Sequence, residues 1–272
     1  MDYREIRFEL AEGVAQITLA CPERRNAFSG RMGQEWSHAY RRCDADDAVR
    51  AVVVTGSGDS FCVGADLAAG DATFARQESE DFSAGALATP AWEVRKPVIA
   101  ALNGHAIGLG LTLALQCDIR LLAREGRYGI VQVRRGVMPD AYSHWTLQRL
   151  VGLERAALLL LTGTRIGGDE AAAIGLASRA LPAAEVLPAA LALAREVATQ
   201  TAPLSVAISK RLLWQSATLP RAEVERRETA LHHHLMGRPD SVEGVKAYLE
   251  RRNPRFTGSV ARDWPEWPGG ED

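Results

Sequence analysis

The sequence predicts an α/β core followed by a helical C-terminal region. Short apolar runs typical of buried strands alternate with helical patterns over the first two-thirds of the chain. One of these runs, Val49–Thr55, is almost continuously apolar, as in a sheet that is covered on both faces. From about Ala183 onward the pattern is almost entirely helical. We therefore expect a core over residues 1–200 and a helical oligomerisation region over residues 201–272.

The first part of the chain contains two strand candidates and one helix. The strands are Glu5–Glu9 and Val14–Ala20, joined across Glu12-Gly13. Ser29 is a suitable N-cap for the helix that follows. Apolar residues recur in that helix at helical spacing, which predicts one buried face, at Met32, Trp36, Ala39, Tyr40 and Cys43.

A central stretch, Lys96–Asp118, combines a strand, a glycine-lined bend and a helix. Val98–Leu102 is a short apolar run, and Gly108 and Gly110 open the apolar helical segment that follows it. A bend of this kind leaves free N–H groups at the start of the helix, where they can bind negative charge. From spacing alone, a plain strand-turn-helix with small residues for close packing is equally consistent.

Later segments continue the same alternation. A polar, small-residue-rich stretch, Ala68–Ala91, is predicted to be a loop or a frayed helix, and the tail from Asn253 is predicted to be extended. Further strands are expected at Ile119–Ala123 and Tyr128–Val133, and a helix after the bend at Met138-Pro139. The C-terminal helices carry more apolar residues than a small appendage needs, which favours an oligomer, at Leu212, Leu213, Trp214, Leu231 and Leu235.

Composition narrows the class of protein. The chain of 272 residues is 47% hydrophobic and 24% charged, as expected for a soluble globular protein. Its net charge of −2 gives no reason to expect a nucleic acid or a membrane as partner. Met1–Leu10 carries charges throughout and is not a signal peptide. The four cysteines show no C-x-x-C spacing, so we expect reduced core residues of a cytoplasmic protein.

Two motifs carry a family resemblance. S-F-C-V-G-A-D-L at Ser60–Leu67, followed by K-P-V-I-A-A-L-N-G-H-A-I-G-L-G at Lys96–Gly110, resembles the enoyl-CoA hydratase/isomerase (crotonase) superfamily. P-E-R-R-N-A-F-S, L-Q-R-L-V-G and E-G-V-K-A-Y-L-E-R-R-N-P-R-F add to the resemblance, which spans Glu5 to Phe256. It implies a spiral of β-β-α units whose helical C-terminal region builds a homotrimer or a dimer of trimers. It also implies an acyl-CoA thioester substrate, with no separate cofactor and no metal.

The resemblance assigns two backbone N–H groups to an oxyanion hole around the thioester carbonyl. By motif position the donors are Ala65 and Leu109, where the family usually has a third glycine in place of Leu109. A developing enolate needs donors near 3 Å, aimed at the oxygen that gains the charge. Gly64, Gly108 and Gly110 are expected to let the backbone approach the substrate that closely.

The loop Glu23–Phe28 resembles the family's binding loop for the adenine and phosphates of CoA. Arg24 or Arg25 could meet the phosphates, because guanidinium forks match phosphate oxygens. Ala27 in this loop and Asp66 after the first motif are expected to contact the substrate as well. Two solvated arginines on a surface loop are the alternative interpretation.

Two departures from the family pattern bear on the reaction. Where a hydratase of this family has its two glutamates, this sequence has Thr112 and Gln132, and neither can act as a carboxylate base. Asp140 lies where the dienoyl-CoA isomerase and 4-chlorobenzoyl-CoA dehalogenase branches carry a catalytic aspartate. It could move a proton between the α and γ carbons, or attack carbon directly. Alternatively, it is an ordinary helix N-cap before Ala141-Tyr142-Ser143.

These residues favour an acyl-CoA isomerase-like enzyme in which Ala65 and Leu109 hold an enolate and Asp140 moves the proton. A hydratase or acyl-CoA hydrolase that uses water oriented by Thr112 or Gln132 is one alternative. A catalytically poor CoA-ester-binding scaffold is another. His105 falls where the family often has an aromatic residue, and we expect it to be a core histidine.

Overall fold

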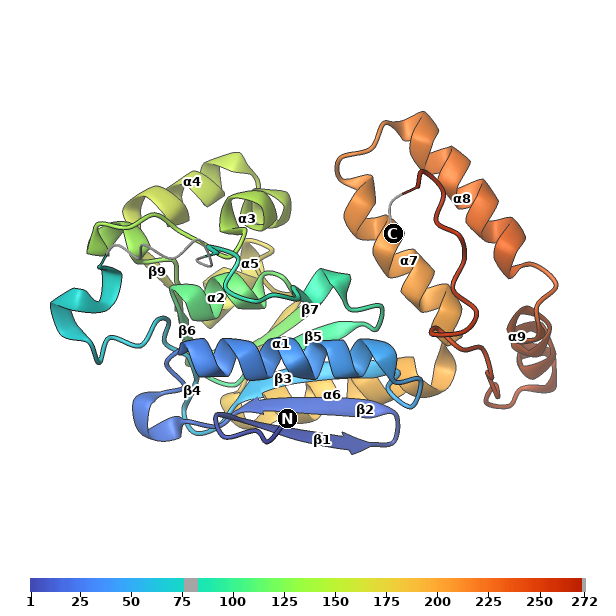
Figure 1. Cartoon of the computed structure of the whole chain (residues 1–272), viewed down its shortest axis with the longest axis horizontal. Helices are drawn as coiled ribbons and strands as arrows, with labels where there is room; N and C mark the ends of the chain where they lie inside the picture. The colour runs from blue at the N-terminus through green and yellow to red at the C-terminus, as the bar shows by residue number, and fades with distance from the viewer. Residues whose placement is uncertain (76–82, 271–272) are drawn as a thin grey trace.

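The computed structural model describes residues 1–75 and 83–270, and two sheets organise them (Figure 1). The larger sheet has the order β1-β2-β3-β5-β7-β10 and is parallel except for the first pair. Its strands are β1 (Ile6–Ala11), β2 (Val14–Leu19), β3 (Ala51–Gly56), β5 (Val98–Leu102), β7 (Ile119–Ala123) and β10 (Arg179–Leu181). The smaller sheet consists of β4 (Ser60–Cys62), β6 (His105–Ile107), β8 (Arg127–Gly129) and β9 (Arg165–Gly167).

The chain winds as a spiral between these sheets. In three successive turns one strand enters the larger sheet and the next enters the smaller one: β3 then β4, β5 then β6, β7 then β8. The helices lie around the sheets and beyond them. They are α1 (Gly30–Ala45), α2 (Leu109–Ala114), α3 (Ser143–Val151), α4 (Leu153–Thr162), α5 (Gly168–Ala173), α6 (Ala183–Gln200), α7 (Pro203–Ser216), α8 (Arg221–Leu235) and α9 (Pro239–Glu250). The predicted α/β class with a helical C-terminal region is confirmed.

Both faces of the larger sheet are buried at β3, as its apolar run predicts. Val52 and Val54 face the core that contains Trp36 of α1, whereas Val53 faces the core that α6 covers with Val186. Alternate residues of a strand point to opposite faces, so a doubly covered strand must be apolar throughout. The predicted cap of α1 is also confirmed, because Ser29 accepts a hydrogen bond from the N–H of Met32 at 3.1 Å.

Helices α7 to α9 lie to one side of the sheets and have a small core of their own (Figure 1). Lys210 of α7 fixes this region to the sheets. Its buried Nζ lies 2.7 Å from Oδ2 of Asp118 and also donates to the carbonyl oxygens of Ala91 and Lys96. Trp214 of α7 donates to Oδ1 of the same aspartate at 2.7 Å.

An aromatic cluster fills the seam between α7 and the core. Trp214 stacks on Trp145 of α3 at 5.5 Å between ring centroids. The ring of Trp92 lies 5.3 Å from that of Trp145 and 5.5 Å from that of Trp214. Farther along the seam, Trp264 and Trp267 of the tail stack on each other at 5.7 Å. The indole N–H of Trp267 donates to Gln215 of α7, which holds the tail on this helix.

Some expectations differ from the structure. The predicted strand Tyr128–Val133 is only three residues long, Arg127–Gly129, and the chain then forms the 3-10 helix η4 (Gln132–Arg135). The strand is short because its neighbour β9 offers only three partner residues. In the stretch Ala68–Ala91 the structure describes the 3-10 helix η2 (Gly70–Phe74), and residues 76–82 lie outside the described part. Short 3-10 helices also begin at Pro22 (η1, Pro22–Arg24) and Ala91 (η3, Ala91–Glu93).

Two further observations concern composition. All four cysteines are buried and unpaired, and burial raises the pKa of Cys43, Cys62 and Cys117 to about 12. Among residues 1–75 and 83–270, the helices are too short or too polar to cross a membrane.

Candidate active site

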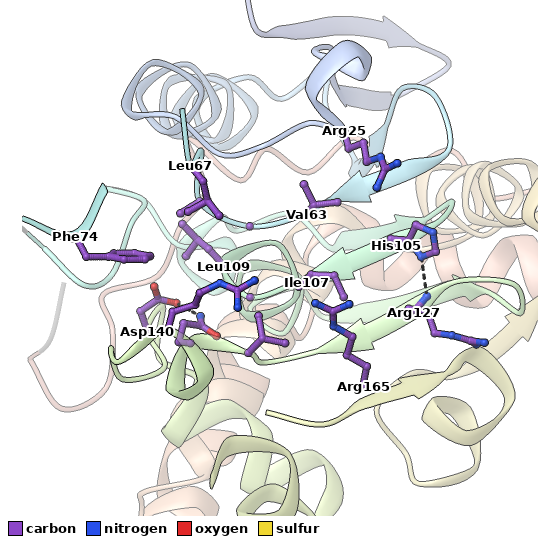
Figure 2. A pocket seen from close by; sticks show the side chains of 16 residues that line it. Arg25, Val63, Leu67, Phe74, His105, Ile107, Leu109, Arg127, Asp140 and Arg165 are labelled. Atoms are coloured by element: carbon purple, nitrogen blue, oxygen red, sulfur yellow. Dashed lines mark hydrogen bonds between the residues drawn. The ribbon is translucent and has the colours of Figure 1, made fainter. Parts of the chain in front are cut away.

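A cavity of about 300 Å³ lies where β4, β6, the start of α2 and η4 meet (Figure 2). Its lining combines residues from segments that are far apart in the sequence: Arg25, Ala65, Leu109, Gln132 and Asp140. The spiral produces this arrangement, because successive turns place the ends of β4, β6 and β8 side by side in the smaller sheet. The cavity therefore gathers most of the residues that the sequence motifs single out.

Two backbone N–H groups are available to a ligand in this cavity. Ala65 bridges Phe28 in a parallel pair, in which the N–H of Phe28 donates to Gly64 and the N–H of Asp66 donates to Phe28. N–H groups alternate in direction along an extended segment, so that of Ala65 points away from Phe28. Leu109 is the first residue of α2, and its N–H has no acceptor within the helix. Among the described residues, neither N–H takes part in a backbone hydrogen bond outside the regular elements.

The glycines explain why the two donors lie close together. A Cβ atom on Gly64 would lie 3.6 Å from the nitrogen of Leu109 and only 2.8 Å from the carbonyl oxygen of Ile107, so any side chain here would force the two segments apart. Gly108 has φ 55° and ψ −125°, a conformation open to glycine almost alone. Both glycines let the two segments approach each other, as an oxyanion hole requires.

Gly110 has a different role from the one expected. A Cβ atom here would lie 2.2 Å from the carbonyl oxygen of Cys62, so Gly110 lets α2 pack directly on β4. The glycine-rich bend thus combines the two predicted features, a turn that exposes an N–H donor and small residues that allow close packing. Gly108 shapes the turn before the donor, and Gly110 allows close packing.

Asp140 is held in the cavity by the two residues that replace the family's glutamates. The hydroxyl of Thr112 lies 3.1 Å from Oδ1 of Asp140, and Nε2 of Gln132 donates to the same oxygen at 2.9 Å. Burial raises the pKa of Asp140 above its ordinary value, although these two hydrogen bonds act in the opposite direction. Both of these side-chain bonds fall on Oδ1, and no side-chain partner of Oδ2 occurs in the described part of the chain.

The interpretation of Asp140 as a helix N-cap is wrong. Helix α3 begins at Ser143, its cap residue is Tyr142 in a left-handed conformation, and no side chain caps it. Only the carbonyl oxygen of Asp140 accepts from the N–H of Ser143, at 3.0 Å. The carboxylate is therefore committed to the cavity and not to the helix.

The two arginines of the predicted phosphate loop have separate roles. Arg24 lies 2.6 Å from Glu5 and 2.5 Å from Asp66, so both Arg24 and Asp66 are engaged in ion pairs. Neither of them, nor the buried Ala27, is among the described residues that line the cavity. Arg25 does line it, and its side chain has no carboxylate partner in the described ranges. Of the loop residues expected to contact the substrate, Arg25 alone is placed to do so from within the cavity.

Several lining residues were not predicted from the sequence. His105 is half-buried and lines the cavity, and its Nδ1 accepts from the backbone N–H of Arg127 at 3.1 Å, so the expectation of a core histidine is wrong. Three arginines of the smaller sheet and η4 also line the cavity: Arg127, Arg135 and Arg165. Recognition of β6, β8 and β9 as strands of one sheet would have brought these residues together.

Comparison with known proteins gives a consistent result. Residues 9–259 match a family model described as enoyl-CoA hydratase/isomerase. A probable enoyl-CoA hydratase/isomerase from Mycobacterium abscessus has 51% sequence identity and a TM-score of 0.91, over 94% of this chain and 99% of that one. A putative enoyl-CoA hydratase from Streptomyces coelicolor A3(2) has 32% identity and a TM-score of 0.88, over 94% and 95% of the two chains. Among curated proteins, an enoyl-CoA hydratase from Alternaria alternata is 36% identical over 252 residues, covering 92% of this chain and 85% of its own length.

Proposed function

The chain belongs to the enoyl-CoA hydratase/isomerase family, and we propose that it moves a proton on the acyl group of a CoA thioester, with Asp140 as acid and base. The thioester oxygen accepts hydrogen bonds from the N–H groups of Ala65 and Leu109. Oδ2 of Asp140 removes a proton from the γ carbon of a β,γ-enoyl ester, and the electron pair moves into an enolate. The same oxygen returns the proton to the α carbon. One proton and one double bond shift, and nothing is added.

One observation carries this proposal. The only carboxylate that lines the cavity in the described part of the chain is Asp140, and Thr112 and Gln132 hold it by Oδ1. Its raised pKa favours proton transfer at neutral pH more than an ordinary aspartate would allow. Thr112 and Gln132 therefore act as supports of the acid and not as acids themselves.

The remaining expectations complete the proposal. Arg25 binds the phosphates of CoA, and the reaction needs no cofactor besides the CoA of the substrate. Residues 201–272 build a homotrimer or a dimer of trimers, and nucleic acids and membranes take no part. Buried, unpaired cysteines support a reducing, cytoplasmic location.

Hydration of the double bond is the second candidate. The printed names of the relatives from Alternaria alternata and Rhodobacter capsulatus are enoyl-CoA hydratase and probable enoyl-CoA hydratase. In addition, Oε1 of Gln132 is buried and has no hydrogen-bond partner among the described residues, so it could accept from a water molecule. In this case Asp140 would take a proton from that water as it attacks the β carbon.

Mass analysis in heavy water separates the candidates. The purified protein is incubated with β,γ- and α,β-enoyl-CoA esters, and the products are weighed. Chromatography separates the products before they are weighed. A shifted double bond without added water indicates isomerisation, whether the transferred proton is retained or exchanged for deuterium. Added water indicates hydration, and free CoA indicates hydrolysis. Recovery of every ester unchanged would refute the proposal and favour a binding scaffold.

Asp140→Asn is the decisive variant. Asparagine keeps an Oδ1 acceptor for Thr112 and Gln132, so the site should keep its shape. Turnover should fall about a hundredfold or more, the usual scale for loss of a general acid or base. Near-normal turnover of Asp140→Asn would remove Asp140 from the mechanism.

A further inference from the structure

Arg135 lines the same cavity, but the proposed reaction does not use it. No carboxylate of the described residues lies within ion-pair distance of its guanidinium group, and this includes Asp140. Arg135 is exposed to solvent in the ligand-free structure. A ligand that fills the cavity would cover part of its guanidinium group and remove water from it, and an anionic group on that ligand would offset the loss of hydration. Within residues 1–75 and 83–270, the protein therefore supplies no carboxylate partner to Arg135.

The cavity has two ends of different character, and Figure 2 shows them. At one end lie three of its arginines and a histidine, Arg25, Arg127, Arg165 and His105. This cationic end suits the phosphates of CoA. At the other end lie Leu67, Phe74 and Asp140, which we call the acyl end.

Arg135 belongs to the acyl end. It follows Gln132 by three residues in the 3-10 helix η4. Side chains three residues apart are eclipsed in a 3-10 helix, so Arg135 lies on the same side as Gln132. Gln132 in turn donates to Asp140 at 2.9 Å, which places the arginine beside the reacting group and away from the CoA end.

The thioester connects the two ends. With its carbonyl held by Ala65 and Leu109, the CoA chain leaves toward the cationic end and the acyl chain toward Asp140. There the acyl chain meets the apolar side chains of Leu67 and Leu109 and the guanidinium group of Arg135, which has no ion-pair partner among the described residues. A plain alkyl chain would cover that cation without pairing it, whereas a carboxylate would pair with it in a two-pronged hydrogen-bonded contact.

We propose that the preferred substrate is a CoA thioester whose acyl chain carries a second carboxylate, and that Arg135 binds this carboxylate. The inference rests on the proposed function, because it uses the same thioester position. It adds the substrate class and a specificity-determining residue.

Calorimetry with two saturated esters tests the inference without relying on turnover. Glutaryl-CoA carries a terminal carboxylate, pentanoyl-CoA ends in a methyl group, and neither has a double bond to shift. At one fixed salt concentration, the protein should bind glutaryl-CoA about tenfold or more tightly than pentanoyl-CoA, the scale of one hydrogen-bonded charge pair. Arg135→Met should reduce this ratio to near one, and Arg135→Lys should keep part of it.

Arg134→Met is the matched control. Its Nε donates to the carbonyl oxygen of Thr162 at 2.7 Å, and the residue does not line the cavity. This variant should keep the wild-type ratio. Arg25→Met provides a second comparison, because loss of a contact to CoA should weaken both esters by the same factor.

Each outcome decides a separate point. The inference would be overturned if the wild type bound both esters with equal affinity or bound neither of them. It would also be overturned if Arg135→Met weakened the binding of both esters by the same factor. A preference for glutaryl-CoA that depends on Arg135, in a protein that converts no enoyl ester, would uphold the carboxylate site and refute the proposed reaction.

Discussion

Burial of the Asp140 carboxyl group affects the stability of the fold. Since its folded pKa is raised by burial, the folded protein holds this proton more tightly than the unfolded chain does. The resulting contribution to folding stability is fully present at pH values below the ordinary pKa of aspartate, and it is lost as the pH rises through the raised pKa. At neutral pH the buried charge therefore opposes folding.

Asp140→Asn should accordingly be more stable than the wild type at neutral pH, with the difference shrinking toward pH 4. Urea unfolding across this range measures it. Asp47→Asn serves as a control with the opposite expected effect on stability. Burial acts to raise the pKa of Asp47, but hydrogen bonds from Ser259, Val260 and Ala261 lower it overall. A less stable Asp140→Asn variant at pH 7 would contradict the expectation.

Thr112 influences the pKa of Asp140. Its hydroxyl stabilises the ionised carboxylate, so Thr112→Val should raise the pKa of Asp140 further. The acidic limb of kcat/KM should then move to higher pH, since more alkaline solution is needed to ionise the base. Thr55→Val removes an equally buried hydroxyl, which bonds to Ala101 away from the cavity, and should leave the profile in place. An unshifted limb in Thr112→Val would indicate that Asp140 is not the titrating group.

For single residues, the sequence predicted which positions belong to the candidate site better than it predicted the contacts of their side chains. The motifs located Ala65, Leu109 and Asp140, because backbone turns and a family position are local properties. They could not choose between Arg24 and Arg25, because that choice depends on Glu5, which approaches Arg24 only in the folded chain. For the same reason the cap interpretation of Asp140 failed.

Helix α2 begins at Leu109, the proposed oxyanion donor, and packs on β4 through Gly110. Gly110→Ala would place a methyl group 2.2 Å from the carbonyl oxygen of Cys62, so the helix must move outward. We expect a loss of about 1–3 kcal/mol of stability, the usual range for overpacking, together with lower turnover as Leu109 leaves its position. Gly30→Ala in α1 meets open space and should be neutral in both assays. Full activity of Gly110→Ala would show that the donor tolerates displacement.

Elements with long, regular patterns were predictable, and the short ones were not. The apolar run of β3 and the spacing in α1 match the structure within a few residues. The strands of the smaller sheet have only three residues each, too few to show a period. This sheet supplies much of the cavity wall, so the cationic end could not be predicted.

For the molecule as a whole, Lys210 is a buried polar connection between the core and the C-terminal helices. Lys210→Met would leave Asp118 buried without its cation, which typically costs about 3–5 kcal/mol. Thermal unfolding should show this loss, and Arg221→Met at the exposed start of α8 should not. A small effect at Lys210 would mean that Trp214 and the backbone donor of Val98 satisfy Asp118 unaided.

The apolar surface available for assembly differs from the one expected. Leu212 and Leu231 are buried within the C-terminal core, and Trp214 lies in the aromatic seam. Leu213 is exposed as expected, and the other large apolar residues exposed in this region are Met236, Val242, Val245, Tyr248 and Leu249. We still predict a trimer or hexamer, now through α9, because a surface of this kind is rarely left open to water. Light scattering at micromolar concentration should give a multiple of three chains, and a monomeric mass would refute it.

The aromatic seam also has a consequence for the intrinsic fluorescence of this protein. Of its six tryptophans, only Trp36 lies in the core beneath α1, and the other five line the junction between the sheets and the C-terminal helices. Intrinsic emission is therefore dominated by this junction, and indoles 5.3–5.5 Å apart are close enough to exchange excitation energy. If α7 parts from α3 while the sheets stay intact, fluorescence should change before the circular dichroism of the backbone does. Tryptophan fluorescence should therefore report on the contact between the sheets and the C-terminal helices.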